Sequence, residues 1–201
     1  MKRFLVVVDM QNDFITDALG TKEARAIVDK AVEKIRAFSG DIVVTLDTHG
    51  PDYLNTAEGQ KLPVTHCVRG SKGWELHPAI AEALKGKSFT MVEKPTFGSV
   101  ALPGIIESAA AGEEFSITLI GLCTDICVVS NALLLKAFFP EREISVDAAC
   151  CAGVTPELHC AALATMRSCQ IDVVERDSAS GKSAQGGPAL EETQGPAAEG
   201  T

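Results

Sequence analysis

The sequence predicts an α/β fold in which helices cover both faces of a parallel β-sheet. Short runs of apolar residues, many of them β-branched, alternate along the chain with segments whose apolar residues recur at helical spacing. Strands that are buried on both faces have such continuous apolar runs, and parallel strands need helical connections between them. With 201 residues and a hydrophobic content of 46%, the chain is long enough for one domain with a substantial core.

Six segments have the composition of buried strands. Each has the length of an ordinary strand and is bounded by polar or turn-forming residues. The segments are 4–9, 41–47, 88–94, 117–122, 143–149 and 171–175.

Helices are expected between these strands, at about 22–38, 77–86, 125–139 and 155–169. Gly86 ends the second helix, and Pro140 ends the third. The third helix is expected to begin on Thr124 or Asp125 as its N-cap, because the side-chain oxygens of both residue types accept hydrogen bonds from free N–H groups. Thr155 is the expected N-cap of the fourth helix.

The composition changes near residue 177. The segment from there to the last residue is rich in Gly, Ala, Ser, Pro and Glu, and it has one leucine to bury. Such a segment buries too little apolar surface to offset the entropy lost on ordering. We therefore expect a folded domain at 1–176 and a disordered acidic tail at 177–201.

Charge and cysteine usage limit the class of partner. The formal charge of −9 disfavours nucleic acid or an anionic membrane. Near the N-terminus, Asp9 interrupts an apolar run that is too short for a signal peptide or a membrane span. The seven cysteines do not follow the spacing of a disulfide framework, which fits a reducing compartment. We expect a cytoplasmic protein that acts on a small molecule.

Chemically useful side chains follow the predicted strands, where ligands bind in parallel sheets. These are Asp9, Asp47, Lys94 and Cys123, with Cys127 in the first turn of the next helix. Free N–H groups and the helix dipole stabilise a thiolate at such a turn. A neighbouring Lys94 would lower the thiol pKa, and Asp9 would accept the proton. On this pattern alone Cys127 is either a nucleophile or a packed, inert thiol.

Three segments, VVVDMQNDF, VEKPTFGSV and GLCTDICVV, occur in this order and together resemble the signatures of the isochorismatase-like cysteine hydrolases. The resemblance covers nearly all of residues 1 to 176 and implies a Rossmann-like sheet. It also implies a catalytic triad of Asp9, Lys94 and Cys127. The N–H groups of Cys123 and Cys127 would form an oxyanion hole, with a cis peptide bond before Cys123.

The connection from 49 to 74 is unusually long, and such loops in compact domains are usually functional. With Asp47, it offers His49, Glu58 and His66, a mixed nitrogen and oxygen set that suits zinc, iron or manganese. A loop histidine is more often solvated or hydrogen-bonded, so composition alone does not decide between these interpretations.

A second resemblance concerns this loop. The pattern D-x-H followed by HC-x-x-G is similar to the metal loop of nicotinamidases, in which a metal holds the pyridine nitrogen of the substrate. It implies a divalent metal, with zinc expected first, bound by Asp47, His49 and His66, with Glu58 joining them in a variant of the pattern. Phe14 matches an aromatic residue that stacks on the ring.

Together these resemblances imply hydrolysis of a small carboxamide, namely nicotinamide to nicotinate and ammonia, through a thioester on Cys127. The product would feed NAD salvage, and the enzyme would be a dimer or tetramer. The nearest alternative keeps the triad but acts on another small amide, or a carbamoyl or ureido compound. Alternatives of other classes are a nucleotide-binding module, although G-x-G-x-x-G is missing after the first strand, and a redox sensor using Cys123 and Cys127.

Overall fold

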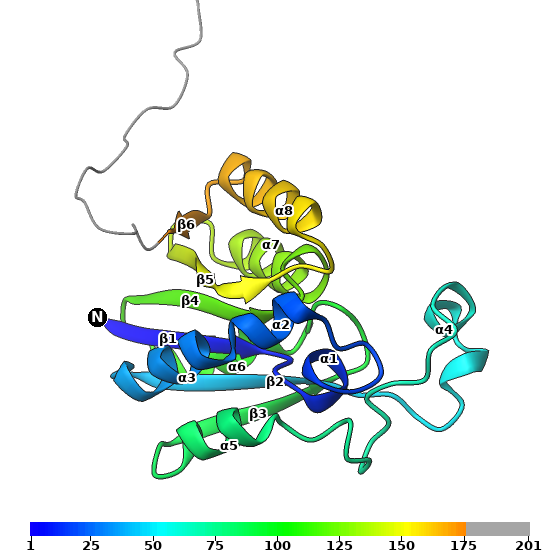
Figure 1. The fold of residues 1–201 in the computed structure, drawn as a ribbon. Helices are drawn as coiled ribbons and strands as arrows, with labels where there is room; N and C mark the ends of the chain where they lie inside the picture. Colours follow the sequence, from blue (N-terminus) through cyan, green and yellow to red (C-terminus); the bar gives the residue numbers. More distant parts are fainter. Residues whose placement is uncertain (176–201) are drawn as a thin grey trace, which may run out of the picture.

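The computed structural model describes residues 1–175 and confirms the predicted α/β class. The strands form one parallel sheet in the order β3-β2-β1-β4-β5-β6 (Figure 1), which is the order of doubly wound Rossmann sheets. The predicted tail at 177–201 lies outside the described residues. The strands are β1 (Lys2–Val8), β2 (Asp41–Asp47), β3 (Phe89–Lys94), β4 (Phe115–Leu122), β5 (Glu143–Ala152) and β6 (Asp172–Val174).

Helices cover both faces of this sheet (Figure 1). Within β1, Val6 belongs to the core on one face and Val7 to the core on the other, as a strand buried on both faces requires. One face is covered by α6 (Leu102–Ala110), α7 (Val129–Phe138) and α8 (Pro156–Ser168). The other is covered by α2 (Lys22–Ala26), α3 (Val28–Ala37) and α5 (Pro78–Leu84).

Two predicted helices differ in form from the expectation. The first is divided into α2 and α3 at Ile27, and this bend keeps Ala24 and Val28, on its two sides, in the same core. The third begins with a π-helical turn, Thr124–Val128, in which the Val128 N–H donates to the Cys123 carbonyl at 3.0 Å. Single π-helical turns of this kind are frequent at functional sites.

The prediction of the N-cap of this turn was wrong. Cys123 occupies the cap position, and no side chain caps the turn. The hydroxyl of Thr124 lies 2.8 Å from His159 Nδ1, and Asp125 accepts a hydrogen bond from the Val154 N–H at 3.0 Å. Thr124 therefore links the turn to α8, and Asp125 links it to the connection between β5 and α8, so neither side chain caps the turn.

Three helices were not expected from the sequence. The first two, α1 (Asn12–Ile15) and α4 (Ala57–Lys61), have about one turn each, too short to show a period. In α6, the helical spacing of Leu102, Ile106 and Ala110, all buried, is a signal that the sequence interpretation overlooked.

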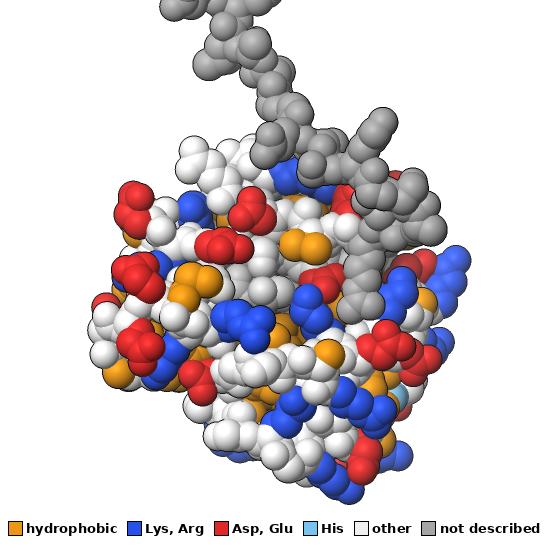
Figure 2. Space-filling view, turned by 90° about the vertical axis from the view of Figure 1, so that its left-hand side faces the viewer, with side chains coloured by type: hydrophobic (Ala, Val, Ile, Leu, Met, Phe, Trp, Pro, Cys, Tyr) orange, Lys and Arg blue, Asp and Glu red, His pale blue; other side chains and the backbone are white. Residues whose placement is uncertain are grey.

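The amino-terminal edge of the sheet presents a mixed surface. Figure 2 shows this face, where Lys and Arg side chains are interspersed with Asp and Glu and with scattered apolar residues. Within residues 1–175, none of the helices combines the length and the apolar character needed to span a membrane.

Gly121 permits the close contact between β4 and β1 beside the site. Its φ is +118°, and a methyl group there would lie 2.1 Å from the Val8 carbonyl oxygen. We expect Gly121→Ala to lower the free energy of unfolding by about 3 kcal/mol or more. Gly104→Ala, in an open position of α6, is the control and should raise it by about 0.5–1 kcal/mol. Urea unfolding measures both, and equal effects would contradict this role of Gly121.

Candidate active site

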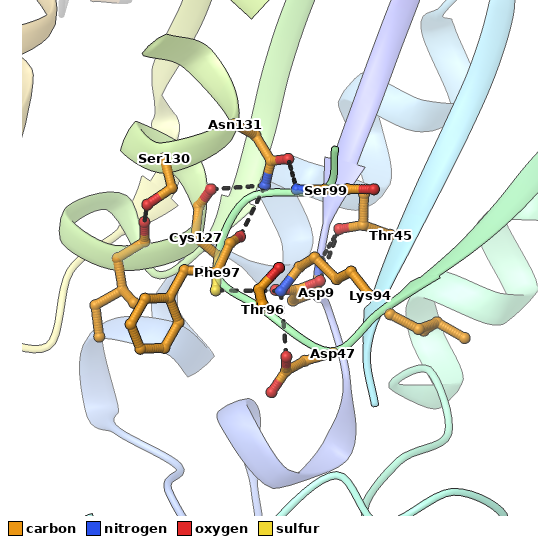
Figure 3. Close-up of polar contacts among 12 residues, drawn as sticks. Asp9, Thr45, Asp47, Lys94, Thr96, Phe97, Ser99, Cys127, Ser130 and Asn131 are labelled. Atoms are coloured by element: carbon orange, nitrogen blue, oxygen red, sulfur yellow. Dashed lines mark hydrogen bonds and ion pairs between the residues drawn. The ribbon is translucent and has the colours of Figure 1, made fainter. Parts of the chain in front are cut away.

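The carboxyl ends of four neighbouring strands bring the predicted side chains together. Asp9 follows β1, Asp47 ends β2, Lys94 ends β3, and Cys127 lies in the π-helical turn that follows β4 (Figure 3). The register of the sheet pairs Asp47 with Lys94 directly. All four side chains are buried, so their charges and hydrogen bonds are poorly screened by water.

Lys94 is the centre of this group. Its ammonium lies 2.7 Å from Asp9 Oδ2, 3.3 Å from Asp47 Oδ1 and 3.4 Å from Cys127 Sγ (Figure 3). Burial by itself would lower the pKa of Lys94, but the charges of Asp9, Cys127 and Asp47 outweigh it and raise that pKa. The side chain therefore stays a cation throughout the physiological range.

Asp9 is fully enclosed. Its Oδ1 accepts a hydrogen bond from the Thr45 hydroxyl at 2.7 Å, and its backbone has a left-handed φ of +48°. Burial raises the pKa of Asp9, and the nearby Asp47 charge adds to that effect, while Lys94 opposes both. The result is a carboxylate with an increased affinity for a proton.

The thiol of Cys127 has a pKa well above its ordinary value, contrary to the expectation from its place at a helix start. Burial is the largest cause, and the Asp9 carboxylate adds to it, so the opposing effect of Lys94 does not prevail. The resting thiol is therefore protonated. The raised pKa of Asp9 suits this carboxylate to accept a proton, which is the role that the sequence predicts for it.

The backbone around the thiol contains the two N–H groups predicted to form an oxyanion hole, those of Cys123 and Cys127. The Cys123 carbonyl accepts hydrogen bonds from the N–H groups of Ile126 at 3.1 Å and of Val128 at 3.0 Å. Among the turn and loop hydrogen bonds between backbone groups of residues 1–175, none has the N–H of Cys123 or Cys127 as its donor. The peptide bond between Leu122 and Cys123 is cis, as the family resemblance implied.

A second group of side chains lies next to the triad. One ligand atom each from Asp47, His49 and His66 lies within 4.8 Å of the others, and all three residues are buried. Oε1 of Glu58 lies 3.7 Å from His49 Nε2 and 3.8 Å from His66 Nε2. The four predicted ligands thus converge on one point.

The chemistry of this group fits a divalent metal. His66 Nδ1 lies 2.8 Å from the Val64 carbonyl, an arrangement in which Nδ1 donates and Nε2 keeps its lone pair for a metal. Burial raises the pKa of Asp47, but hydrogen bonds with His49 and His66 and the charge of Lys94 hold it well below the usual range. Two imidazoles and two carboxylates suit zinc, iron or manganese.

Both groups open into one cavity of about 220 Å³. Cys127 and Cys123 stand at one part of its wall, and Asp47, Glu58 and His66 at another. The remaining wall is mainly apolar and includes Phe14, Leu19, Leu62, Phe97, Ile126 and Val154.

Comparison with known proteins places this site in a family. A family model described as the isochorismatase domain matches residues 3–178. The chain belongs to the isochorismatase family. The three sequence segments that first suggested this family contain Asp9, Lys94 and Cys127, which meet at the strand ends.

Within the isochorismatase family, the chain resembles nicotinamidases. It is 26% identical to the nicotinamidase/pyrazinamidase of Mycobacterium tuberculosis, over 86% of this chain and 98% of that protein. The nicotinamidase/pyrazinamidase structure from Bacillus subtilis is 28% identical, with a TM-score of 0.75 and coverage of 87% of this chain and 100% of that chain.

Two further solved structures are similar to this isochorismatase-family chain. The pyrazinamidase of Pyrococcus horikoshii in complex with zinc is 26% identical, with a TM-score of 0.73 and coverage of 88% and 100% of the two chains. The N-carbamoylsarcosine amidase of Thermoplasma acidophilum is 29% identical, with a TM-score of 0.69 and coverage of 90% and 100%.

In this isochorismatase-family site, the segment after Asp9 is hydrogen-bonded to the residues predicted to bind a metal and to their neighbours. The Gln11 side chain pairs with the backbone of Asp47, accepting from its N–H at 2.8 Å and donating to its carbonyl at 2.9 Å. Asp13 accepts a hydrogen bond from the N–H of Cys67, next to His66, at 2.7 Å. Segments distant in sequence are therefore fixed to each other by buried polar groups.

The sequence interpretation did not identify these supporting residues. Gln11, Asn12 and Asp13 form a polar run directly after an apolar strand and are all buried, so that run was the available signal. Phe97 was also missed, although it lies within the quoted segment VEKPTFGSV. Trp74 donates from Nε1 to the Thr48 hydroxyl at 2.8 Å, a supporting role outside the cavity wall.

We expect Gln11→Glu to weaken metal binding by about 10–100-fold. The new carboxylate oxygen would face the carbonyls of Asp47 and Trp74, to which Nε2 now donates at 2.9 and 2.8 Å. Competition with a chromogenic zinc chelator measures the affinity without any substrate. Gln60→Glu, an exposed glutamine of α4, is the control. Equal affinities in the two variants would show that Gln11 does not hold the donors.

Proposed function

We propose that the protein hydrolyses nicotinamide to nicotinate and ammonia. The main support is the single cavity whose wall contains the Cys127 thiol at one place and the predicted metal donors at another. Between them, Phe14 and Phe97 offer apolar surface for a flat ring. A pyridine that carries a carboxamide has matching features, namely a reactive carbonyl carbon, an apolar ring and a ring nitrogen with a lone pair.

The coarser activity follows from the family relationship. Membership of the isochorismatase family, together with similarity to nicotinamidases, makes the chain a hydrolase of C–N amide bonds. We propose further that the amide is nicotinamide and that the reaction passes through a thioester on Cys127.

The first half of the reaction transfers the acyl group to sulfur. Asp9 accepts the proton of Cys127 as the sulfur attacks the carboxamide carbon, and Lys94 stabilises the developing thiolate. The carbonyl oxygen gains the negative charge and receives hydrogen bonds from the N–H groups of Cys123 and Cys127. Asp9 then donates its proton to the amide nitrogen, the C–N bond breaks, and ammonia leaves.

The second half restores the enzyme. Asp9, now a carboxylate, takes a proton from a water molecule whose oxygen attacks the thioester carbon. The C–S bond breaks, and the sulfur of Cys127 regains its proton from Asp9. Nicotinic acid leaves and loses its carboxyl proton to solvent to become nicotinate. The raised pKa values of Asp9 and Cys127 suit both groups to hold this proton in turn.

A divalent metal would be held by Asp47, His49 and His66, with Glu58 beside them. When bound, it would supply a Lewis acid that accepts the lone pair of the pyridine nitrogen. Around it, Tyr53 packs its buried ring against His49 and His66, with ring centroids 4.6 and 4.9 Å apart, and so limits their movement.

The cavity favours a neutral substrate. Its described wall contains the acidic residues Asp47 and Glu58 but no lysine or arginine. A carboxylate substrate such as N-carbamoylsarcosine would have no lysine or arginine side chain of this wall to pair with. The structural similarity to an amidase of that compound supports, as a second candidate, a small neutral carbamoyl or ureido substrate on the same triad.

A redox role for Cys123 and Cys127 has less support. Burial, with the Asp125 charge, raises the pKa of Cys123 to about 12, so little of the reactive thiolate forms at neutral pH. A contribution to NAD salvage and a homo-oligomeric state are part of the proposal and rest on the family resemblance. The proposed cytoplasmic location rests on the short apolar run before Asp9 and on the cysteine pattern.

Ammonia release from nicotinamide tests the function directly. Metal-loaded wild-type protein should release ammonia, and Cys127→Ala should lower kcat by about 10³-fold or more because the nucleophile is lost. Cys160→Ala, at an exposed cysteine of α8, is the control and should retain activity. If the metal-loaded wild type released no ammonia from nicotinamide but hydrolysed a neutral ureido compound, the ureido compound would replace nicotinamide as the proposed substrate.

Replacement of Asp9 should lower the catalytic rate and raise the reactivity of the Cys127 thiol in the same variant. Asp9→Asn should lower kcat by about 10²–10⁴-fold because the base is lost. Loss of the Asp9 charge should also lower the thiol pKa, so iodoacetamide should modify Cys127 faster than in the wild type at pH 7. Slower modification of Cys127 in a folded Asp9→Asn variant would contradict the conclusion that the Asp9 charge raises the pKa of this thiol.

A further inference from the structure

Asn131 connects two parts of the site that lie on different elements. It is fully buried on α7, four residues after Cys127. Its side-chain Nδ2 donates to the Cys127 carbonyl at 2.8 Å and to the Phe97 carbonyl at 3.1 Å, and its Oδ1 accepts from the Ser99 N–H at 2.9 Å (Figure 3). Both donors of the amide are therefore used within the active-site region.

The segment that Asn131 holds follows Lys94 directly. It contains Phe97, which lines the cavity although its side chain is 45% exposed. Gly98 packs closely on α7, since a methyl group there would lie 3.4 Å from Ser130. Because the Phe97 ring is partly exposed, few side-chain contacts hold it, and its position depends on that of its backbone. Asn131 fixes this backbone through its bonds to the Phe97 carbonyl and the Ser99 N–H.

Apolar packing alone would not fix this arrangement. Without the amide, the Cys127 carbonyl and the Ser99 N–H would each lose a partner in a buried setting, and the Phe97 carbonyl would lose one in a partly buried setting. Lost partners of this kind favour rearrangement of the chain. The bonds join one turn of α7 to a loop more than thirty residues away. The amide therefore sets the distance between the two.

We propose that Asn131 is a positioning residue that holds the Cys127 turn and the Phe97 wall of the cavity at a fixed separation. One amide thereby aligns the nucleophile with Lys94 and, at the same time, fixes the width of the substrate site. The effect on substrate rests on the proposed function, whereas the effect on the nucleophile does not.

The test combines two variants of Asn131 with a matched control. Asn131→Ala removes all three bonds, and Asn131→Asp keeps the shape and the acceptor but in its ionised form has no donor for the two carbonyls. Ser145→Ala is the control: Ser145 is a buried residue whose hydroxyl bonds to Thr118 and to the Ile117 carbonyl at the far end of the sheet. Thermal unfolding shows which variants are folded before any comparison.

Two readouts separate positioning from general stability. The first is the rate at which iodoacetamide modifies Cys127, followed residue by residue by mass spectrometry so that exposed Cys160 and Cys169 do not interfere. The second is the division of the effect on nicotinamide turnover between kcat and KM. Both Asn131 variants should change the modification rate by about threefold or more, lower kcat about tenfold and raise KM. Ser145→Ala should change none of these.

If folded Asn131 variants behave like Ser145→Ala in both readouts, the proposal is overturned. Should the alanine variant not fold, Asn131→Asp and Asn131→Ser give the same decision, since each fills the position with a polar side chain. If the wild type does not hydrolyse nicotinamide, the proposed function is refuted. The modification rates of Cys127 would still decide the role of Asn131.

Discussion

The buried ammonium of Lys94 is the interaction on which the site depends. It contacts Asp9, Asp47 and Cys127, which come from three other strand ends, and it is nearly inaccessible to water. Two buried carboxylates near each other repel, and neither is well solvated. The cation between them makes the arrangement stable, and it fixes the thiol relative to its base and to the metal donors in the same step.

The same arrangement bears on the mechanism that we propose. A thiolate beside two carboxylates is disfavoured, and burial adds to that effect, so the resting thiol keeps its proton. In the proposed mechanism, negative charge would develop only as the sulfur bonds to a carbonyl carbon, where the N–H groups of Cys123 and Cys127 would stabilise it. The sulfur would therefore become a strong nucleophile only with a substrate in the cavity.

Much of the fold was predictable because its strands are continuous apolar runs with polar or reactive side chains at their ends. That rule, together with the family resemblance, predicted that Asp9, Lys94 and Cys127 lie together, and the resemblance of the loop predicted the same for His49 and His66. Gln11 and Asn131 were not, because the role of a buried amide depends on partners 36 and 32 residues away. Thr124 and Asp125 misled the cap assignment for the same reason.

The connection between β2 and β3 has a consequence for how such enzymes diversify. It contains His49, Glu58 and His66, and none of the triad. Asp47 alone belongs to both groups, since it contacts Lys94 through one oxygen and the histidines through the other. In the function that we propose, the metal contact to the substrate and the cleavage of the bond are therefore carried by separate parts of the chain that share one carboxylate. An exchange of that connection can give a descendant a new substrate while the machinery on the strand ends is inherited unchanged.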